Sequence, residues 1–197
     1  MHRERTAART TSQRILPAAC FAVALFFVSM ADATTIARMS LAQMSQAAAL
    51  IVRARCTGNS VAVDAGEIWT FTSFDVEETL RGNAPSQVTV RLLGGSLGNI
   101  TSHVSGIPRF RPGEDVILFL QPTQRGDFSV VSWEQGTFRI RRAPSGTQSY
   151  VTQDTASFPT FDPATRQFRA TGIRHMPLEK FREQLQALLR NARSPRP

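Results

Sequence analysis

The feature that most constrains this chain is a run of five apolar residues that follows a proline–glycine turn. Pro112 and Gly113 favour a type II turn, because proline presets its own φ to about −65° and glycine supplies the positive φ needed next. Val116–Leu120 then follows without a polar residue, and Pro122 ends the segment. A run this short and β-branched at its start is typical of a strand covered on both faces. The sequence therefore predicts a central strand with other strands around it.

Residues 1–33 have the three parts of an export signal. Four arginines precede an apolar stretch, residues 15–28, that is too short to span a bilayer comfortably. Ala31-Asp32-Ala33 has the A-x-A form of a cleavage site, so we expect cleavage after Ala33; a retained membrane anchor is the alternative. The prediction is an exported protein, in the periplasm, at the cell surface or outside the cell, with no stable membrane span after cleavage.

Residues 34–197 suit one domain with its own core. We divide them into a β-domain over 34–174 and a C-terminal helix with a basic tail over 175–197, packed on the same domain. The net charge is +8 for the whole chain and +6 without the leader, because the leader carries four arginines against two acids. Cys56 is the only cysteine outside the leader, so no internal disulfide can form. A small buried hydrophobe is its expected role, and a reactive thiol is the alternative.

A short helix and a strand are predicted ahead of the long central part of the chain. Ser40–Ala49 begins with a serine that can cap a helix and has glutamine in the capping-box position. Leu50–Cys56 alternates apolar residues with two arginines, which predicts a strand. We expect this strand to end in a loop over residues 57–60.

The next two strands are expected to form a hairpin. Glu67–Leu80 is rich in aromatic and β-branched residues, but its apolar positions change parity between Phe71 and Phe74. That change predicts a β-bulge near Thr72-Ser73, of the kind that lets a sheet curl into a barrel. Gln87–Leu93 returns as the second strand, with its valines and Leu92 inward.

Three further strands and a second helix are predicted beyond the central strand. The strands are expected over Phe128–Trp133, Thr137–Arg142 and Gln148–Thr152. In the second of them, Arg139 and Arg141 should point outward. Pro177–Asn191 has one stripe of leucine and phenylalanine, which predicts an amphipathic helix that closes an end of the barrel; a groove for a partner is the alternative.

The polar segment over residues 153–172 should form a loop lying over the barrel. Phe158, Phe161 and Phe168 are spaced as anchors for such a loop.

Residues that could carry catalysis are few. His103 and His175 are the only histidines outside the leader, and no histidine, cysteine or carboxylate pair has the spacing of metal ligands. The H-E-x-x-H and G-x-S-x-G motifs do not occur. Convergence of His103 with Cys56 or Asp75 in the fold is the alternative. We therefore predict no enzyme, no metal and no cofactor.

Phosphate and nucleic acid are not expected ligands. Gly94–Asn99 is glycine-rich, but a phosphate cradle needs a following helix, whereas Ile100–Val104 is predicted to be extended. It is expected to be a mobile connection between strands. Several arginines could line a basic face, as in single-strand binders. Lysine is nearly absent, however, and the aromatic residues mostly have inward parity.

Four segments in this order carry a resemblance to a known family: Leu50–Arg55, Phe74–Gly82, Val88–Arg91 and Phe110–Phe119. Together they resemble the netrin-like, or tissue-inhibitor-of-metalloproteinase-like, OB-fold domains, and also exported bacterial domains of the same outline. The resemblance covers about Ser45 to Ile140 and implies an OB-like β-barrel.

One departure from that family bears on function. The resemblance implies that inhibitors of this group chelate the catalytic zinc through an N-terminal cysteine. The expected mature N-terminus, near Thr34, has no cysteine. Inhibition by that mechanism is therefore not expected here.

The sequence thus predicts a mainly β, OB-like closed β-barrel with a short N-terminal helix and a C-terminal amphipathic helix. The expected function is non-catalytic binding of a protein or cell-envelope component by a monomer. A peptidase inhibitor or peptidase-associated domain that inserts a loop is the alternative, and a small hydrolase using His103 is the third. The candidate ligand-binding residues lie on the loop Gly94–Pro108 and just after it. They are Gly94, Gly95, Gly98, His103, Arg109 and Arg111.

Overall fold

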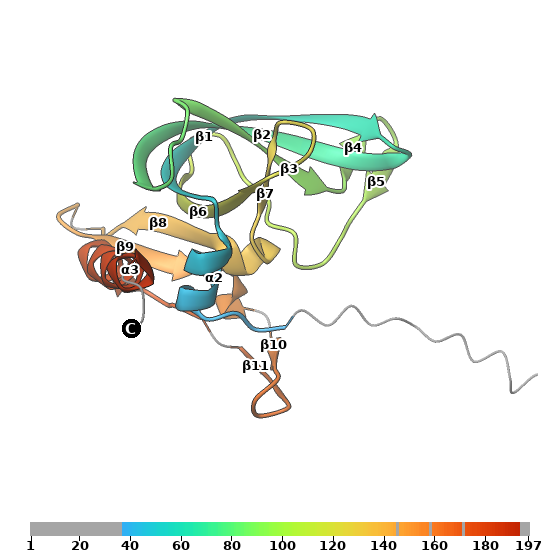
Figure 1. The fold of residues 1–197 in the computed structure, drawn as a ribbon. Helices are drawn as coiled ribbons and strands as arrows, with labels where there is room; N and C mark the ends of the chain where they lie inside the picture. The colour runs from blue at the N-terminus through green and yellow to red at the C-terminus, as the bar shows by residue number, and fades with distance from the viewer. Residues whose placement is uncertain (1–36, 145, 158, 171, 194–197) are drawn as a thin grey trace, which may run out of the picture. The chain divides into compact units, whose positions relative to one another are not determined.

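The computed structural model (Figure 1) describes residues 37–193, except for residues 145, 158 and 171. The predicted export signal, Phe158 and residues 194–197 of the basic tail lie outside the described residues. None of the helices in the described part is long and apolar enough to cross a bilayer.

The described chain is mainly β, with two α-helices, as predicted. The helices are α2 (Leu41–Ala47) and α3 (Leu178–Arg193), and two 3-10 turns are η2 (Trp133–Gly136) and η3 (Asp154–Ser157). The strands are β1 (Leu50–Asp64), β2 (Glu67–Arg81), β3 (Gln87–Leu93), β4 (Gly95–Leu97), β5 (Ile100–Ser102), β6 (Asp115–Pro122), β7 (Phe128–Val130), β8 (Thr137–Arg142), β9 (Ser149–Gln153), β10 (Pro159–Asp162), β11 (Gln167–Ala170) and β12 (Met176–Pro177).

Five strands form a ring of paired neighbours. The path runs from β1 through β2, β3, β7 and β6 and returns to β1. The β3–β7 contact is parallel and rests on the single pair Val90 and Phe128, whereas the other four pairings are antiparallel. The same sheet continues from β6 through β8 and β9 to the two-residue strand β12.

The predicted central strand is confirmed as β6. It pairs with β1 along one edge and with β7 and β8 along the other, and Val116–Leu120 is buried throughout. The preceding turn is also as predicted: Gly113 has φ of +88°, and the Glu114 N–H donates to the Arg111 carbonyl at 3.1 Å. Proline at the second position and glycine at the third are what a type II turn requires.

The two faces of β6 support two separate apolar clusters. Val116 and Leu118 point into the ring and pack with Phe74 and Phe110. Ile117 and Phe119 point the other way, toward α2 and α3. Because successive side chains of a strand alternate in direction, one buried strand serves both layers.

The C-terminal helix is confirmed, but it does not close an end of the ring. Phe181 and Leu185 of α3 are fully buried against Phe138 and against β9, outside the ring. Helix α2 lies beside α3 over the same face (Figure 1). Its capping box is also confirmed: the Ser40 hydroxyl accepts from the Gln43 N–H, and the Gln43 side chain accepts from the Ser40 N–H.

The predicted end of the first strand is wrong. Strand β1 continues through residues 57–60 to Asp64, where Ala65 and Gly66, both with positive φ, turn the chain into β2. Thr57 has no partner in the register, because Cys56 faces Phe74 while Gly58 already faces Ser73. One bulge therefore lies on β1, opposite the predicted site on β2, whereas two further register shifts skip Glu77 and Leu80 of β2.

The parity change in β2 has another cause. Thr70, Thr72 and Phe74 form one continuous buried row, so the strand keeps its phase across the predicted bulge site at Thr72-Ser73. Trp69 and Phe71 lie on the opposite face, where the Arg91 guanidinium covers both rings. These two aromatic residues are half-buried on the outer face because an arginine covers them. Their parity was therefore wrongly taken as evidence of a bulge.

Three other predictions are corrected. The strand expected to end at Trp133 stops at Val130, because Ser132 and Trp133 adopt positive φ and lead into η2. Arg139, expected to face solvent, is largely buried in an ion cluster. The expected loop over the ring is a hairpin, β10–β11, in which Phe161 and Phe168 contact each other and Phe168 is 61% exposed.

Candidate ligand-binding site

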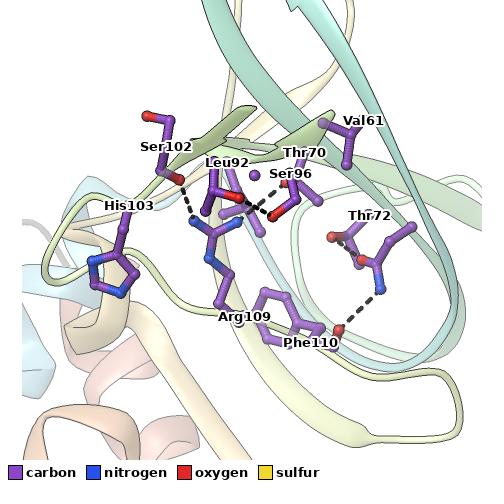
Figure 2. Close-up of a pocket in the computed structure, with 12 residues that line it drawn as sticks. Val61, Thr70, Thr72, Leu92, Ser96, Ser102, His103, Arg109 and Phe110 are labelled. Atoms are coloured by element: carbon purple, nitrogen blue, oxygen red, sulfur yellow. Dashed lines mark hydrogen bonds between the residues drawn. The ribbon is translucent and has the colours of Figure 1, made fainter. Parts of the chain in front are cut away.

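A cavity of about 420 Å³ lies where the small hairpin β4–β5 packs against the β1–β2 hairpin and the loop that leads to β6 (Figure 2). Three of the six candidate residues line it: Gly95, His103 and Arg109. Gly94 adjoins it through contacts described below. The full lining is Asn59, Val61, Thr70, Thr72, Leu92, Gly95, Ser96, Thr101, Ser102, His103, Arg109 and Phe110.

Two glycines allow the β4–β5 hairpin to fold against the ring. Gly94 has φ of +87°, and its N–H donates to the Ile68 carbonyl at 2.7 Å. A Cβ on Gly94 would lie 2.6 Å from the Ser102 carbonyl oxygen, and one on Gly95 would lie 2.6 Å from Thr70 Oγ1. A side chain at either position would push the hairpin away from the cavity wall. These glycines therefore set the distance between the hairpin and the ring.

The inner wall of the cavity is polar at two buried threonines that the sequence analysis did not single out. Thr70 Oγ1 donates to the Gly94 carbonyl at 2.7 Å, and Thr72 Oγ1 donates to Asn59 Oδ1 at 2.6 Å. Asn59 Nδ2 in turn donates to the Phe110 carbonyl at 2.9 Å, which ties β1 to the loop. The sequence could have indicated them, because both threonines share the parity of the inward-facing Phe74 and so place small polar side chains in an inward row.

Arg109 places its guanidinium at the rim of this cavity. Nη1 donates to Thr70 Oγ1 at 3.2 Å, and Nη2 donates to the Ser102 carbonyl at 3.5 Å (Figure 2). His103, on the same loop, lies exposed at the mouth. Ser96 and Thr101 add two hydroxyls, 3.0 Å apart, on the hairpin side. The site therefore combines a cation, several hydroxyls and an apolar wall.

The remaining two candidate residues do not reach the cavity. Gly98 lies at the tip of the β4–β5 hairpin with open space around it. Arg111 is exposed in the turn before β6, where its backbone N–H donates to Glu114 Oε2 at 3.1 Å. The expected connection at Gly94–Asn99 is thus part of a hairpin, and no helix follows it, in agreement with the prediction of an extended segment after it.

An ion cluster around Arg139 holds the loop that leads to β6 in place. Arg139 forms a bidentate pair with Asp154, at 2.6 and 2.9 Å, and a further pair with Glu114. Its Nη2 also donates to the Arg109 carbonyl at 2.7 Å, and its guanidinium lies 5.3 Å from the centre of the Phe110 ring. Arg139 therefore positions the backbone from which Arg109 extends.

The three residues considered for catalysis, His103, Cys56 and Asp75, form no hydrogen-bonded group in the described part of the chain. Cys56 is buried, and burial raises the pKa of its thiol. Asp75 accepts a hydrogen bond from Gln87 at 2.8 Å. In the part of the chain that the structure describes, no hydrogen bond links His103 to Cys56 or Asp75. No group of three or more histidine, cysteine or carboxylate side chains among those residues could hold a metal ion.

The fold and the cavity define a mainly β domain with a ligand-sized hollow beside a five-stranded ring. No protein-family model matches the chain, and no curated protein matches it.

Proposed function

We propose that this chain is an exported, non-catalytic binding domain with an OB-like β-barrel as its scaffold. The ring of five strands supports the barrel, and the resemblance to netrin-like domains supports the OB-like form. The observation that carries the proposal is the cavity bounded by the β4–β5 hairpin, the threonine row of β2 and Arg109. A concave site on a loop, held by a rigid sheet, is a common arrangement for binding.

Binding is favoured over catalysis by the state of the candidate nucleophile. A reactive cysteine needs a lowered pKa and access to solvent, whereas Cys56 is buried with a raised pKa. His103 is exposed at the cavity mouth, where it can contact a ligand.

Loop insertion into a peptidase is a second candidate function, because the β4–β5 hairpin exposes apolar side chains. Leu97 is 40% and Ile100 62% exposed, on the two strands of that hairpin. Apolar residues on a projecting hairpin suit insertion into a partner's cleft. Capture of a peptidase in the experiment below would favour this alternative.

The test is an affinity capture from a cell-envelope extract with the chain tagged at its C-terminus. One variant replaces Ser96–Thr101 with two glycines, which removes most of the hairpin beside the cavity. The matched control replaces Pro163–Arg166, the turn between β10 and β11, in the same way. We expect a specific protein or envelope component that the first variant loses and the control retains.

Capture that is unchanged when the β4–β5 hairpin is shortened would contradict the proposed site. Size-exclusion chromatography of the same proteins tests the expected monomer.

A further inference from the structure

The Arg109 guanidinium has no acidic partner in the described part of the chain. Its two contacts, with Thr70 Oγ1 and the Ser102 carbonyl, are both with neutral oxygens, at 3.2 and 3.5 Å. An arginine carries five N–H donors in a planar fork, so most of its donor capacity is unused here. No described acidic side chain therefore neutralises the positive charge at the rim of the cavity.

The rest of the cavity lining leaves this charge uncompensated. None of the twelve residues that line the cavity is an aspartate or a glutamate. In two other cavities the arginine in the lining has an acidic partner. Arg38 lines one of them and pairs with Asp162 at 3.3 Å. Arg139 lines the other and pairs with Glu114 and Asp154. A cavity with one permanent cation and no acid favours a ligand group with a single negative charge.

Part of the cavity lining is apolar. Leu92 and Phe110 are buried members of the ring's core, and the half-buried Val61 also lines the cavity. Figure 2 shows the Phe110 ring next to the Arg109 side chain and Val61 at the other end of the lining, beside the hairpin. Because Leu92 and Phe110 are only 3% and 5% exposed, the gain on binding comes mainly from removing the ligand's own apolar group from water, while its charged end stays at the rim.

We propose that the cavity binds a carboxylate attached to a small branched apolar group. The carboxylate lies against Arg109, which can meet both of its oxygens with parallel N–H groups. The apolar group lies against Val61, Leu92 and Phe110. A phosphate is the poorer match, because a second negative charge has no second permanent cation among the lining residues. This inference rests on the binding function proposed above.

The same chemistry can come from a free branched-chain acid or from the C-terminus of a peptide. Calorimetric titration of the full-length chain with isovalerate and with its neutral isostere isovaleramide tests the carboxylate directly and requires no variant. Titration with acetyl-Ala-Val, as the free acid and as the C-terminal amide, distinguishes the sources. Tighter binding of the peptide acid than of isovalerate would indicate a chain terminus, and equal binding a free acid.

We expect each acid to bind about tenfold or more tightly than its amide, since a charge-assisted hydrogen bond is lost in the amide. Arg109→Gln should weaken binding of each acid to the level seen with its amide. Arg111→Gln is the matched control: it removes the same charge two residues away, at a position that does not line the cavity, and should change binding by less than about twofold. Binding of the acids should also weaken as salt is added.

Equal binding of acid and amide, tighter binding of inorganic phosphate, or no binding of any of these probes at millimolar concentration would overturn the inference. These outcomes are distinguishable from failure of the proposed function. If shortening the β4–β5 hairpin abolishes capture of a partner while the acids show no advantage, the binding site stands and the carboxylate assignment falls. If capture is unaffected by shortening, the proposed function itself fails.

Discussion

The two halves of strand β1 are built differently. Leu50–Cys56 is flanked by β2 on one edge and β6 on the other, and its apolar residues are buried. Gly58–Asp64 pairs with β2 alone in the described part of the chain, and all of its residues are at least partly exposed. The Thr57 bulge separates the halves. One continuous strand thus belongs to the core in its first half and to the cavity wall in its second.

This difference explains where the candidate site can lie. The inner half cannot change its residues without disturbing two apolar clusters, since Ile51 belongs to one and Val52 to the other. The outer half contributes Asn59 and Val61 to the cavity without completing a core layer. Binding residues can therefore be placed on a strand whose other end fixes the fold.

The largest effect on stability is expected at the ion cluster around Arg139, which lies next to the Leu50–Cys56 half of β1. Glu114 accepts the Cys56 N–H at its carbonyl, at 2.9 Å, and its side chain pairs with Arg139. Arg139→Met would leave Glu114 and Asp154 partly buried without their cation, so we expect the free energy of unfolding to fall by about 3–5 kcal/mol. Denaturant unfolding measures this. The control is Arg141→Met, at an exposed position on the same strand, and equal losses in the two variants would contradict the assignment.

A smaller effect on stability should distinguish the two halves of β1. Val52 is fully buried and Val63 is 58% exposed, so the same change has different costs on one strand. Val52→Ala should lower the free energy of unfolding by about 2 kcal/mol, through lost burial and a residual cavity. Val63→Ala should change it by less than about 0.5 kcal/mol. Urea unfolding of both variants checks this, and similar costs would show that both halves belong to the core.

The smallest effect is a dependence on pH near the ion cluster. Burial, and then the charge of Asp154, raise the pKa of Glu134. The folded state then holds this proton more tightly than the unfolded chain. The stabilisation from Glu134 is fully present below its unfolded pKa, about 4.3, and is lost as pH rises through the higher folded value.

We therefore expect Glu134→Gln to reduce the decline in unfolding free energy between about pH 4 and pH 7. Urea unfolding at several pH values measures the slope. Glu179→Gln, at a position where the side chain is 79% exposed, is the control and should leave the slope unchanged. A steeper decline in the Glu134 variant would contradict the sign of the shift.

Much of the fold could be predicted because its signals are local. The strands over Gln87–Leu93 and Thr137–Arg142 have the predicted bounds, since alternation of side chains depends only on neighbours in the chain. The end of β1 was misplaced because Thr57-Gly58-Asn59-Ser60 has the composition of a turn. Its partner β2 keeps those residues extended.

The candidate site could be predicted only in part. Gly94, Gly95, His103 and Arg109 were found because they lie on one glycine-rich loop and just beyond it. Asn59, Thr70 and Thr72 were missed, although they complete the wall, because nothing in their own strands indicates that a hairpin will lie over them. Gly98 and Arg111 were included by proximity in sequence, which does not determine the direction of a side chain.

By itself, the sequence determined the central strand, the turn before it, the capped helix α2 and the amphipathic helix α3. Each depends on steric preferences and hydrophobic periods that act over a few residues. Only the tertiary structure decided that the helices cover the sheet outside the ring and that Arg139 is buried between two carboxylates. It also decided that Arg109 meets no carboxylate among residues 37–193 as far as they are described. The burial or pairing of a charge depends on which distant segments pack around it, and no local pattern specifies those neighbours.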